Sequence, residues 1–319
     1  MKKVCSVIMT FVLLVCISVA GTGVLSSAAV RDTDVSDAAA GNAIVGVKGK
    51  YESIKATKIL DRVNEIRKEA CKKGYRNPVT GEKLTMDDYV EIKWSSTLEW
   101  IASIRAAEST VLGAHVRPNG ESCFTVTKDG EQSWGEVLAW NYDGMMQGIE
   151  QWYGEKNDWV NQNTDAVTGH YTAMISPNSR YIGVAAFASA DGGWIGVAGE
   201  FSSRNPGTEK KLKLKENVIQ KVEVTKASFS GGRILGAASL TQGDQKAYRL
   251  VKKVVYSNGV HGENHTTTGM ILDGIKWKSS NTKIVSVDDN GKVTAKKPGK
   301  ATITAVCGKK VFTKTIEVK

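Results

Sequence analysis

The sequence predicts an α+β protein with a mixed first half and an all-β second half. Three observations carry this prediction. Helical periodicity is confined to residues before about 155, a strand hairpin follows near residue 190, and no helical stripe appears after residue 210. Helices followed by strands are typical of α+β folds. The length of 319 residues fits two domains, and 41% hydrophobic with 24% charged residues excludes a wholly disordered chain.

The first 29 residues are typical of a signal peptide. Lys2 and Lys3 precede an apolar run over residues 7–19, and small-x-small motifs permit cleavage after Ala20 or Ala29. The run is short for a membrane span, so we expect no transmembrane segment after cleavage. The expected location is secreted or extracellular, with cell-wall association as a further expectation. Residues 30–53 are rich in Ala, Gly and Asp without periodicity, which predicts a flexible lead-in.

Three helices and a hairpin follow. Apolar residues recur at three- and four-residue steps over 59–71, with Gly74 as the stop. A second helix opens with Ser96 and Glu99, whose spacing predicts a capping box. A third helix is expected over 143–154. Apolar runs at 181–188 and 194–201, joined by a Gly-containing turn, predict two antiparallel strands.

Charge divides the chain near residue 210. Residues 210–319 hold 22 Lys and Arg against 8 Asp and Glu, whereas residues 1–209 hold 21 against 25. This step and a turn-rich stretch predict a linker at 203–217. Short apolar runs from about 221 to 318, separated by turns, predict a β-sandwich over 218–319. The lysines alternate with Val, Ile and Thr rather than clustering with aromatics, so we expect no nucleic-acid partner. Weak attraction to anionic wall polymers is expected instead.

Removal of the signal peptide leaves three cysteines, Cys71, Cys123 and Cys307. An odd number excludes a disulfide-rich scaffold. A bridge between Cys71 and Cys123 stays open as an alternative. The preferred interpretation is three thiols that pack as small hydrophobic side chains.

Two of the four histidines and two glutamates stand in distinctive local sequences: His115, Glu136, Glu155 and His170. Imidazole and carboxylate are the side chains that bind zinc-like cations or transfer protons near neutral pH. Taken singly, each residue has a structural explanation, and for a lone histidine we prefer it: a hydrogen-bonded histidine in the core or at the surface, or a solvated helix glutamate. Spacing alone does not assemble them.

Four strings, at 135–140, 152–155, 169–174 and 181–185, resemble the CAP superfamily of cysteine-rich secretory proteins, antigen 5 and pathogenesis-related 1 proteins, also called SCP domains. The resemblance implies an α-β-α sandwich over residues 54–202. It also implies an open cleft that carries His115, Glu136, Glu155 and His170. Lipid and sterol ligands are implied by the same family. Val137 stands where the family pattern has Asn, which removes an amide beside the cleft.

The segments 275–287, 290–295 and 298–305 resemble the group 2 bacterial immunoglobulin-like domain. This resemblance is specific over 275–319 and thinner over 219–274. It implies an immunoglobulin-like β-sandwich at the end of the chain.

These interpretations predict a secreted or cell-surface binding protein. Its cleft would take a small-molecule ligand, either lipid-like or sterol-like or derived from the wall. His115 and His170 would hold a divalent metal such as zinc, with affinity that weakens below about pH 6 as histidine protonates. The immunoglobulin-like domain would be a spacer or adhesion module toward a cell wall or host surface. The alternatives are a metal-assisted hydrolase with Glu136 or Glu155 as general base, and a purely structural interaction protein. No catalytic residue is assigned.

Overall fold

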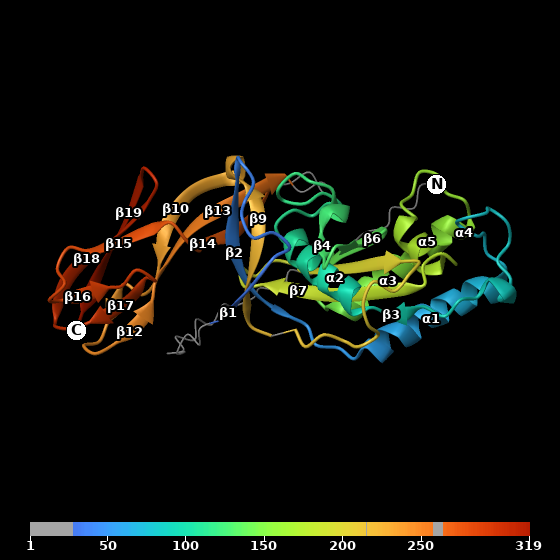
Figure 1. Cartoon of the computed structure of the whole chain (residues 1–319), viewed down its shortest axis with the longest axis horizontal. Coiled ribbons are helices and arrows are strands. Elements are labelled where there is room, and N and C mark those ends of the chain that lie inside the picture. Colours follow the sequence, from blue (N-terminus) through green and yellow to red (C-terminus); the bar gives the residue numbers. More distant parts are fainter. Residues whose placement is uncertain (1–27, 215, 258–263) are drawn as a thin grey trace, which may run out of the picture.

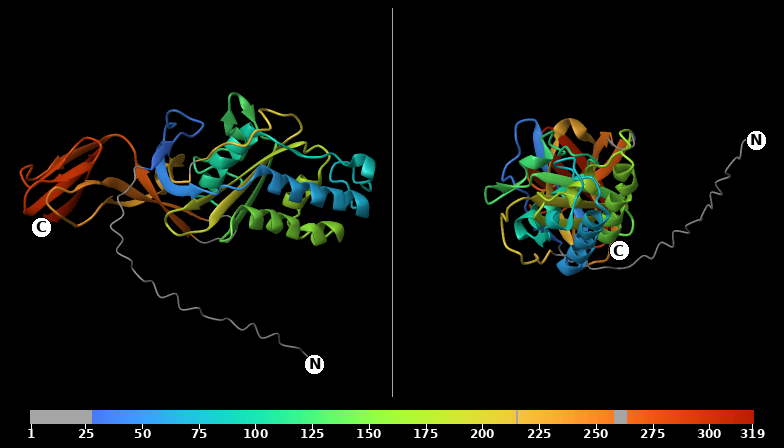
Figure 2. Two further views of the ribbon diagram at one scale, coloured as in Figure 1. Left: turned by 90° about the horizontal axis from the view of Figure 1, so that it is seen from below. Right: turned by 90° about the vertical axis from the view of Figure 1, so that its right-hand side faces the viewer.

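The computed structural model describes residues 28–214, 216–257 and 264–319. The molecule is elongated, with helices at one end, a small β-sandwich at the other, and strands of one long sheet between them (Figures 1 and 2). Most of the expected signal peptide, residues 1–27, lies outside the described residues. Within the described part of the chain, no helix is both long enough and apolar enough to cross a bilayer.

The first half is an α-β-α sandwich. Its central strands separate two cores, because successive side chains of a strand point to opposite faces. Ile182 and Val184 join one core with three helices, whereas Ala185 and Phe187 join the other with a single helix. The strands are β6 (Gly135–Asn141), β7 (Tyr181–Ser189) and β8 (Ile195–Ser202). The single helix is α2 (Ser96–Ser109), and the three-helix face carries α1 (Ala56–Lys73), α3 (Met145–Gly154) and α5 (Gly169–Ile175), with α4 (Lys156–Val160) beside them.

The expected helices and hairpin are present. Helix α1 ends at Gly74, whose φ of 63° is the left-handed conformation that glycine adopts most readily. The predicted capping box at the start of α2 is wrong. Ser95 is the cap, and Glu99 is fully buried, where it accepts a hydrogen bond from the Trp94 indole at 2.9 Å. The same carboxylate accepts from Leu212 N at 2.7 Å, so it ties the expected linker to the first half.

The flexible lead-in predicted over 30–53 is wrong in its second half. Residues 42–51 form β2 (Asn42–Tyr51), an internal strand, and β1 (Ala29–Arg31) precedes it. The glycines suggested flexibility, but here they permit close packing: a Cβ at Gly46 would lie 2.4 Å from Ile219, and one at Gly49 would lie 2.3 Å from Phe187. Val45 and Val47 are buried on one face of the strand.

Strand β2 joins the two halves of the chain. It pairs antiparallel with β9 (Val218–Thr225) over residues 42–49, with β7 over 49–51, and with β14 (Asn264–Ile271) over 45–46. Because Gly46 and Gly49 each have two partners, β9 lies on one edge of β2 and both β7 and β14 lie on the other. Strands β13 (Arg249–Ser257) and β10 (Phe229–Leu235) extend this ten-stranded sheet. The stretch 203–217 therefore does not separate two independent sheets.

The end of the chain is an all-β sandwich, as predicted. The predicted bounds of 218–319 are wrong at their start, because β9, β10, β13 and β14 belong to the ten-stranded sheet. Its core residues, among them Val293, Ile303 and Ile316, are fully buried between two small sheets. One sheet contains β11 (Ser239–Leu240), β19 (Lys310–Val318), β18 (Gly299–Cys307) and β15 (Ile275–Ser279). The other contains β12 (Gln245–Ala247), β17 (Lys292–Ala295) and β16 (Val285–Val287). The remaining short elements are β3 (Lys93–Trp94), β4 (Thr127–Lys128), β5 (Glu131–Gln132), and the 3-10 turns η1 (Met86–Asp88), η2 (Cys123–Thr125) and η3 (Lys226–Ser228).

Candidate functional site

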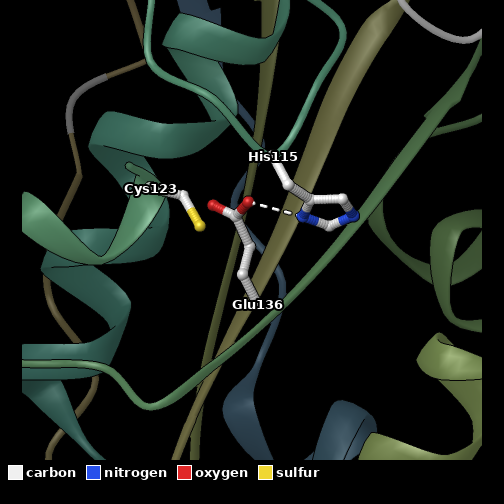
Figure 3. A group of neighbouring side chains, drawn as sticks. All are labelled: His115, Cys123 and Glu136. Atoms are coloured by element: carbon white, nitrogen blue, oxygen red, sulfur yellow. Dashed lines mark hydrogen bonds and ion pairs between the residues drawn. The ribbon is translucent and has the colours of Figure 1, made fainter. Parts of the chain in front are cut away.

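The first half of the site is a histidine–carboxylate pair. His115 lies in the loop after α2, and its side chain is half exposed. Glu136 is the second residue of β6 and is almost fully buried. The Nδ1 atom of His115 lies 2.7 Å from Oε1 of Glu136, and Figure 3 shows the two groups facing each other. The carboxylate on the strand thus contacts a loop residue that lies 21 positions earlier in the sequence.

A second pair is built in the same way. His170 is the second residue of α5, and its Nδ1 lies 2.5 Å from Oε1 of Glu155. The other Glu155 oxygen accepts hydrogen bonds from the backbone N–H groups of His170, at 2.9 Å, and Tyr171, at 3.1 Å. These are first-turn N–H groups that have no partner within the helix. One carboxylate therefore fixes both the helix start and the histidine ring.

The two pairs meet. The rings of His115 and His170 are stacked, with centroids 5.7 Å apart and an interplanar angle of 30°. We call His115, Glu136, Glu155 and His170 the tetrad. The structure brings together all four residues that the sequence singled out. Because each Nδ1 faces a carboxylate, each ring keeps Nε2 available for a ligand, which is the arrangement that metal-binding histidines use.

A buried chain of side chains with alternating charge is hydrogen bonded to Glu136. The Arg105 guanidinium donates to Glu136 at 2.5 Å and to Glu108 at 2.6 Å. Arg117 then bridges Glu108 and Asp34, with 2.7 Å to each. All of these side chains are at most 3% exposed. Burial alone would raise the pKa of Glu136, but Arg105 and His115 lower it to about 2.

A further carboxyl group, Glu200, lies directly across from Glu136 in the pairing of β6 with β8. It is 1% exposed, and among the described residues its Oε1 has no hydrogen-bond partner. Burial, and next the negative charge of Glu136, raise the pKa of Glu200 well above its usual range. The site therefore holds one carboxylate that favours the ionised form and a neighbour that favours the protonated form.

The thiol of Cys123 also faces Glu136 (Figure 3). Donor atoms of His115, Cys123 and Glu136 all lie within 4.8 Å of one another, so these three residues form a second geometric candidate for an ion. Burial and the charge of Glu136 raise the pKa of Cys123 to about 12. Reactive cysteines have the opposite shift, so a nucleophilic role is disfavoured. All three cysteines of the described residues are free, and the Cys71–Cys123 bridge is not formed.

Strands from the second half of the chain hold the loop that carries His115. The Tyr256 hydroxyl of β13 donates to the Pro118 carbonyl, which also accepts from Thr225 N at 3.1 Å. The Asn119 amide donates to Glu223 of β9 at 2.8 Å. The site is therefore completed by residues that the sequence assigned to a separate module.

Sequence reasoning missed Arg105, Cys123 and Glu200 as members of the site. Arg105 is buried within α2, and a buried charge carries no periodicity signal. Glu200 becomes adjacent to Glu136 only through the strand register, which a single sequence does not reveal. Val137, which replaces the expected Asn, is fully buried in the core that the sheet shares with α1, α3 and α5. Glu136 is oriented by Arg105 and not by an amide side chain.

Two family models match the chain. Residues 60–197 match the cysteine-rich secretory protein family (CAP), and residues 252–318 match the bacterial Ig-like domain (group 2). No curated protein matches.

Two solved structures are similar in part. Venom allergen-like protein 4 of Schistosoma mansoni is 18% identical over 47% of this chain and 94% of that chain, with a TM-score of 0.32. An intimin mutant of EHEC O157:H7 is 23% identical over 28% of this chain, with a TM-score of 0.19. The chain covers 46% of that intimin chain. At these TM-scores the assignment rests on the family models. The chain therefore contains a domain of the cysteine-rich secretory protein (CAP) family followed by a group 2 bacterial Ig-like domain.

Proposed function

We propose that this is a secreted, surface-associated binding protein whose tetrad holds a divalent cation such as zinc beside a ligand site. The observation that carries the proposal is the doubled imidazole–carboxylate pair. Two histidines from different elements have rings 5.7 Å apart, and each is oriented by its own glutamate. Zinc sites combine neutral imidazoles with a carboxylate or water, and a carboxylate on the second ring nitrogen strengthens each ligand.

His115 and His170 are the proposed metal ligands. Glu136 and Glu155 hold the rings, and carboxylates or water would complete the coordination. A bound cation would supply Lewis acidity next to the ligand site. Cys123 is less suited, since its thiol must lose a proton whose pKa is raised to about 12.

The test is calorimetry with zinc at pH 7. We expect the double variant His115→Ala/His170→Ala to lose at least tenfold in affinity. His265→Ala, a histidine on β14 outside the tetrad, is the matched control and should bind as the wild type does. Equal affinity in the wild type and the double variant would remove the proposal.

A hydrolase that uses the same cleft is the second candidate, and it must rely on Glu155. Glu136 is held by Arg105 and has a pKa near 2, so it is a weak base. Glu155 is 16% exposed and is free of any arginine contact among the described residues. Hydrolysis that survives Glu155→Gln would eliminate this candidate.

Secretion and surface attachment complete the proposal. Ala29 opens β1 and pairs with Val218, so removal of the signal peptide after Ala20 preserves the strand, whereas cleavage after Ala29 would shorten it. Mass spectrometry of protein from the culture medium should therefore find an N-terminus at residue 21. A secreted form that still begins with Met1 would contradict it. The basic Ig-like part is the proposed contact to a wall or host surface, and retention on wall material that resists high salt would speak against that electrostatic contact.

A further inference from the structure

A groove with uncharged walls lies beside the tetrad. It has a volume of about 600 Å³ and runs between the start of β6, the helix α5 and the end of β8. Gly135 and Gly169 line it, and each immediately precedes a tetrad residue, Glu136 and His170. Two of its lining residues are thus direct chain neighbours of the tetrad, although no tetrad side chain lines the groove itself.

The described side chains that line the groove are all uncharged. None of the described residues that line it is Asp, Glu, Lys, Arg or His. The polar groups it offers are hydroxyls and one amide, among them Thr172, Ser176, Asn178, Ser179 and Ser203. Hydroxyls and amides both donate and accept hydrogen bonds. Such walls match a ligand that carries many neutral hydroxyl groups, and they offer no counter-charge to an anion or a cation.

Trp134 forms one wall and is exposed over 67% of its surface. It is not part of a loose loop, because its backbone N–H donates to the Phe201 carbonyl at 2.9 Å just before β6 begins. An exposed indole on a fixed backbone is a preorganised platform. The C–H groups on the face of a pyranose ring stack on the electron-rich face of an aromatic ring. An alkyl chain would instead favour an enclosed, apolar pocket.

We propose that this groove binds an uncharged oligosaccharide, with one sugar ring stacked on Trp134 and its hydroxyls bonded to the serine and threonine walls. This inference rests on the proposed function, since it names the wall-derived class of ligand for the ligand site beside the tetrad.

The probe is the neutral hexamer of N-acetylglucosamine, titrated against the full chain by calorimetry. We expect Trp134→Ala to weaken binding by about tenfold to a hundredfold, the usual loss for one stacked ring. Trp134→Phe should recover part of it. Ala173→Lys, which places a long charged side chain in the groove, should abolish binding.

Tyr142→Ala is the matched control. Tyr142 is 72% exposed and follows the opposite end of β6, roughly 26 Å from Trp134 at 3.3 Å per residue. It should bind as the wild type does. An equal loss in Tyr142→Ala and Trp134→Ala, or no binding of the hexamer by the wild type, would overturn the inference.

Three further outcomes separate this inference from the proposed function. Zinc binding that needs both histidines, without any binding of the hexamer, refutes the sugar groove alone. A second such result is binding of sterol-containing lipid vesicles that does not compete with the hexamer and that persists in Ala173→Lys. That result refutes the sugar groove and indicates a protein that binds lipid at another site. Hexamer binding without zinc binding supports the groove and refutes the metal site.

Discussion

Replacement of Glu223 by glutamine tests whether the second half of the chain supports the site. The Glu223 carboxylate accepts three hydrogen bonds, from Ala39 N at 2.8 Å, the Asn42 amide at 3.1 Å and the Asn119 amide at 2.8 Å. The first two reach Oε1, and the third reaches Oε2. Glutamine keeps one accepting oxygen, so it can retain the first two bonds. Its –NH₂ group would then face the amide donor of Asn119 in the loop that carries His115.

The magnitude follows from this loss. A hydrogen bond to a charged group contributes about 1.5–3 kcal/mol, and Glu223 is only 3% exposed, which leaves little access for water. We therefore expect the variant to lose about 2–3 kcal/mol of unfolding free energy at pH 7. Burial by itself would raise the pKa of Glu223, but its hydrogen bonds from Asn119 and Ala39 lower it. A lowered pKa stabilises the fold above the unfolded value near 4.3, and that contribution is lost as the pH falls through the folded value. The difference between variant and wild type should shrink in acid.

The assay is urea unfolding at pH 7 and pH 4, with hydrogen exchange of residues 115–120 as the local readout. Glu317→Gln on β19 is the control, because that glutamate is exposed and its ion pair with Lys300 is long, at 3.9 Å. The variant should exchange faster in the loop, whereas the control should not. A stability loss within about 0.5 kcal/mol of the control, together with unchanged exchange in the loop, would refute the reasoning.

Three further outcomes are expected. Glu200→Gln should stabilise the protein increasingly above about pH 4.3, by about 1.4 kcal/mol per pH unit, until the raised pKa of Glu200 is reached. The reason is that only the wild type takes up a proton on folding in this pH range. A pH-independent difference in urea midpoints would contradict this. Arg105→Met should cost about 3–5 kcal/mol because it leaves Glu136 buried without its guanidinium, and an unchanged melting temperature would contradict it. Gly183→Ala should lose folded protein by circular dichroism, because its Cβ would lie 1.9 Å from the Glu99 backbone N, whereas Gly154→Ala, with no atom within 4 Å, should fold normally.

The sequence revealed those elements whose pattern is local. Helix α1 has an apolar stripe and a glycine stop, and the hairpin of β7 and β8 has a Gly-containing turn between two apolar runs. Strand β2 escaped detection because its glycines, which the structure needs for close contact with Ile219 and Phe187, are the residues that also mark flexible segments.

The tetrad could be identified because Glu136, Glu155 and His170 lie in short strings with a family resemblance, and the same resemblance implies His115. Its supporting residues could not, since each depends on a long-range relation. Glu200 reaches Glu136 through strand register, Arg105 through the packing of α2 on the sheet, and Glu223 through a strand 104 residues after Asn119. The second half of the chain supports the site because of the way its strands pair with the first half. The change in charge near residue 210 does not predict this pairing.

The pairing of β2 constrains how the protein can be dissected. A fragment limited to residues 60–197 would discard β2, and the edge of β7 that hydrogen bonds to it would be left open to other chains, a recognised route to aggregation. A fragment limited to 252–318 would strip β14 of the same neighbour and begin inside β13. A fragment for expression of either module, or for fusion to another protein, would therefore need to include the shared strands β2 and β9.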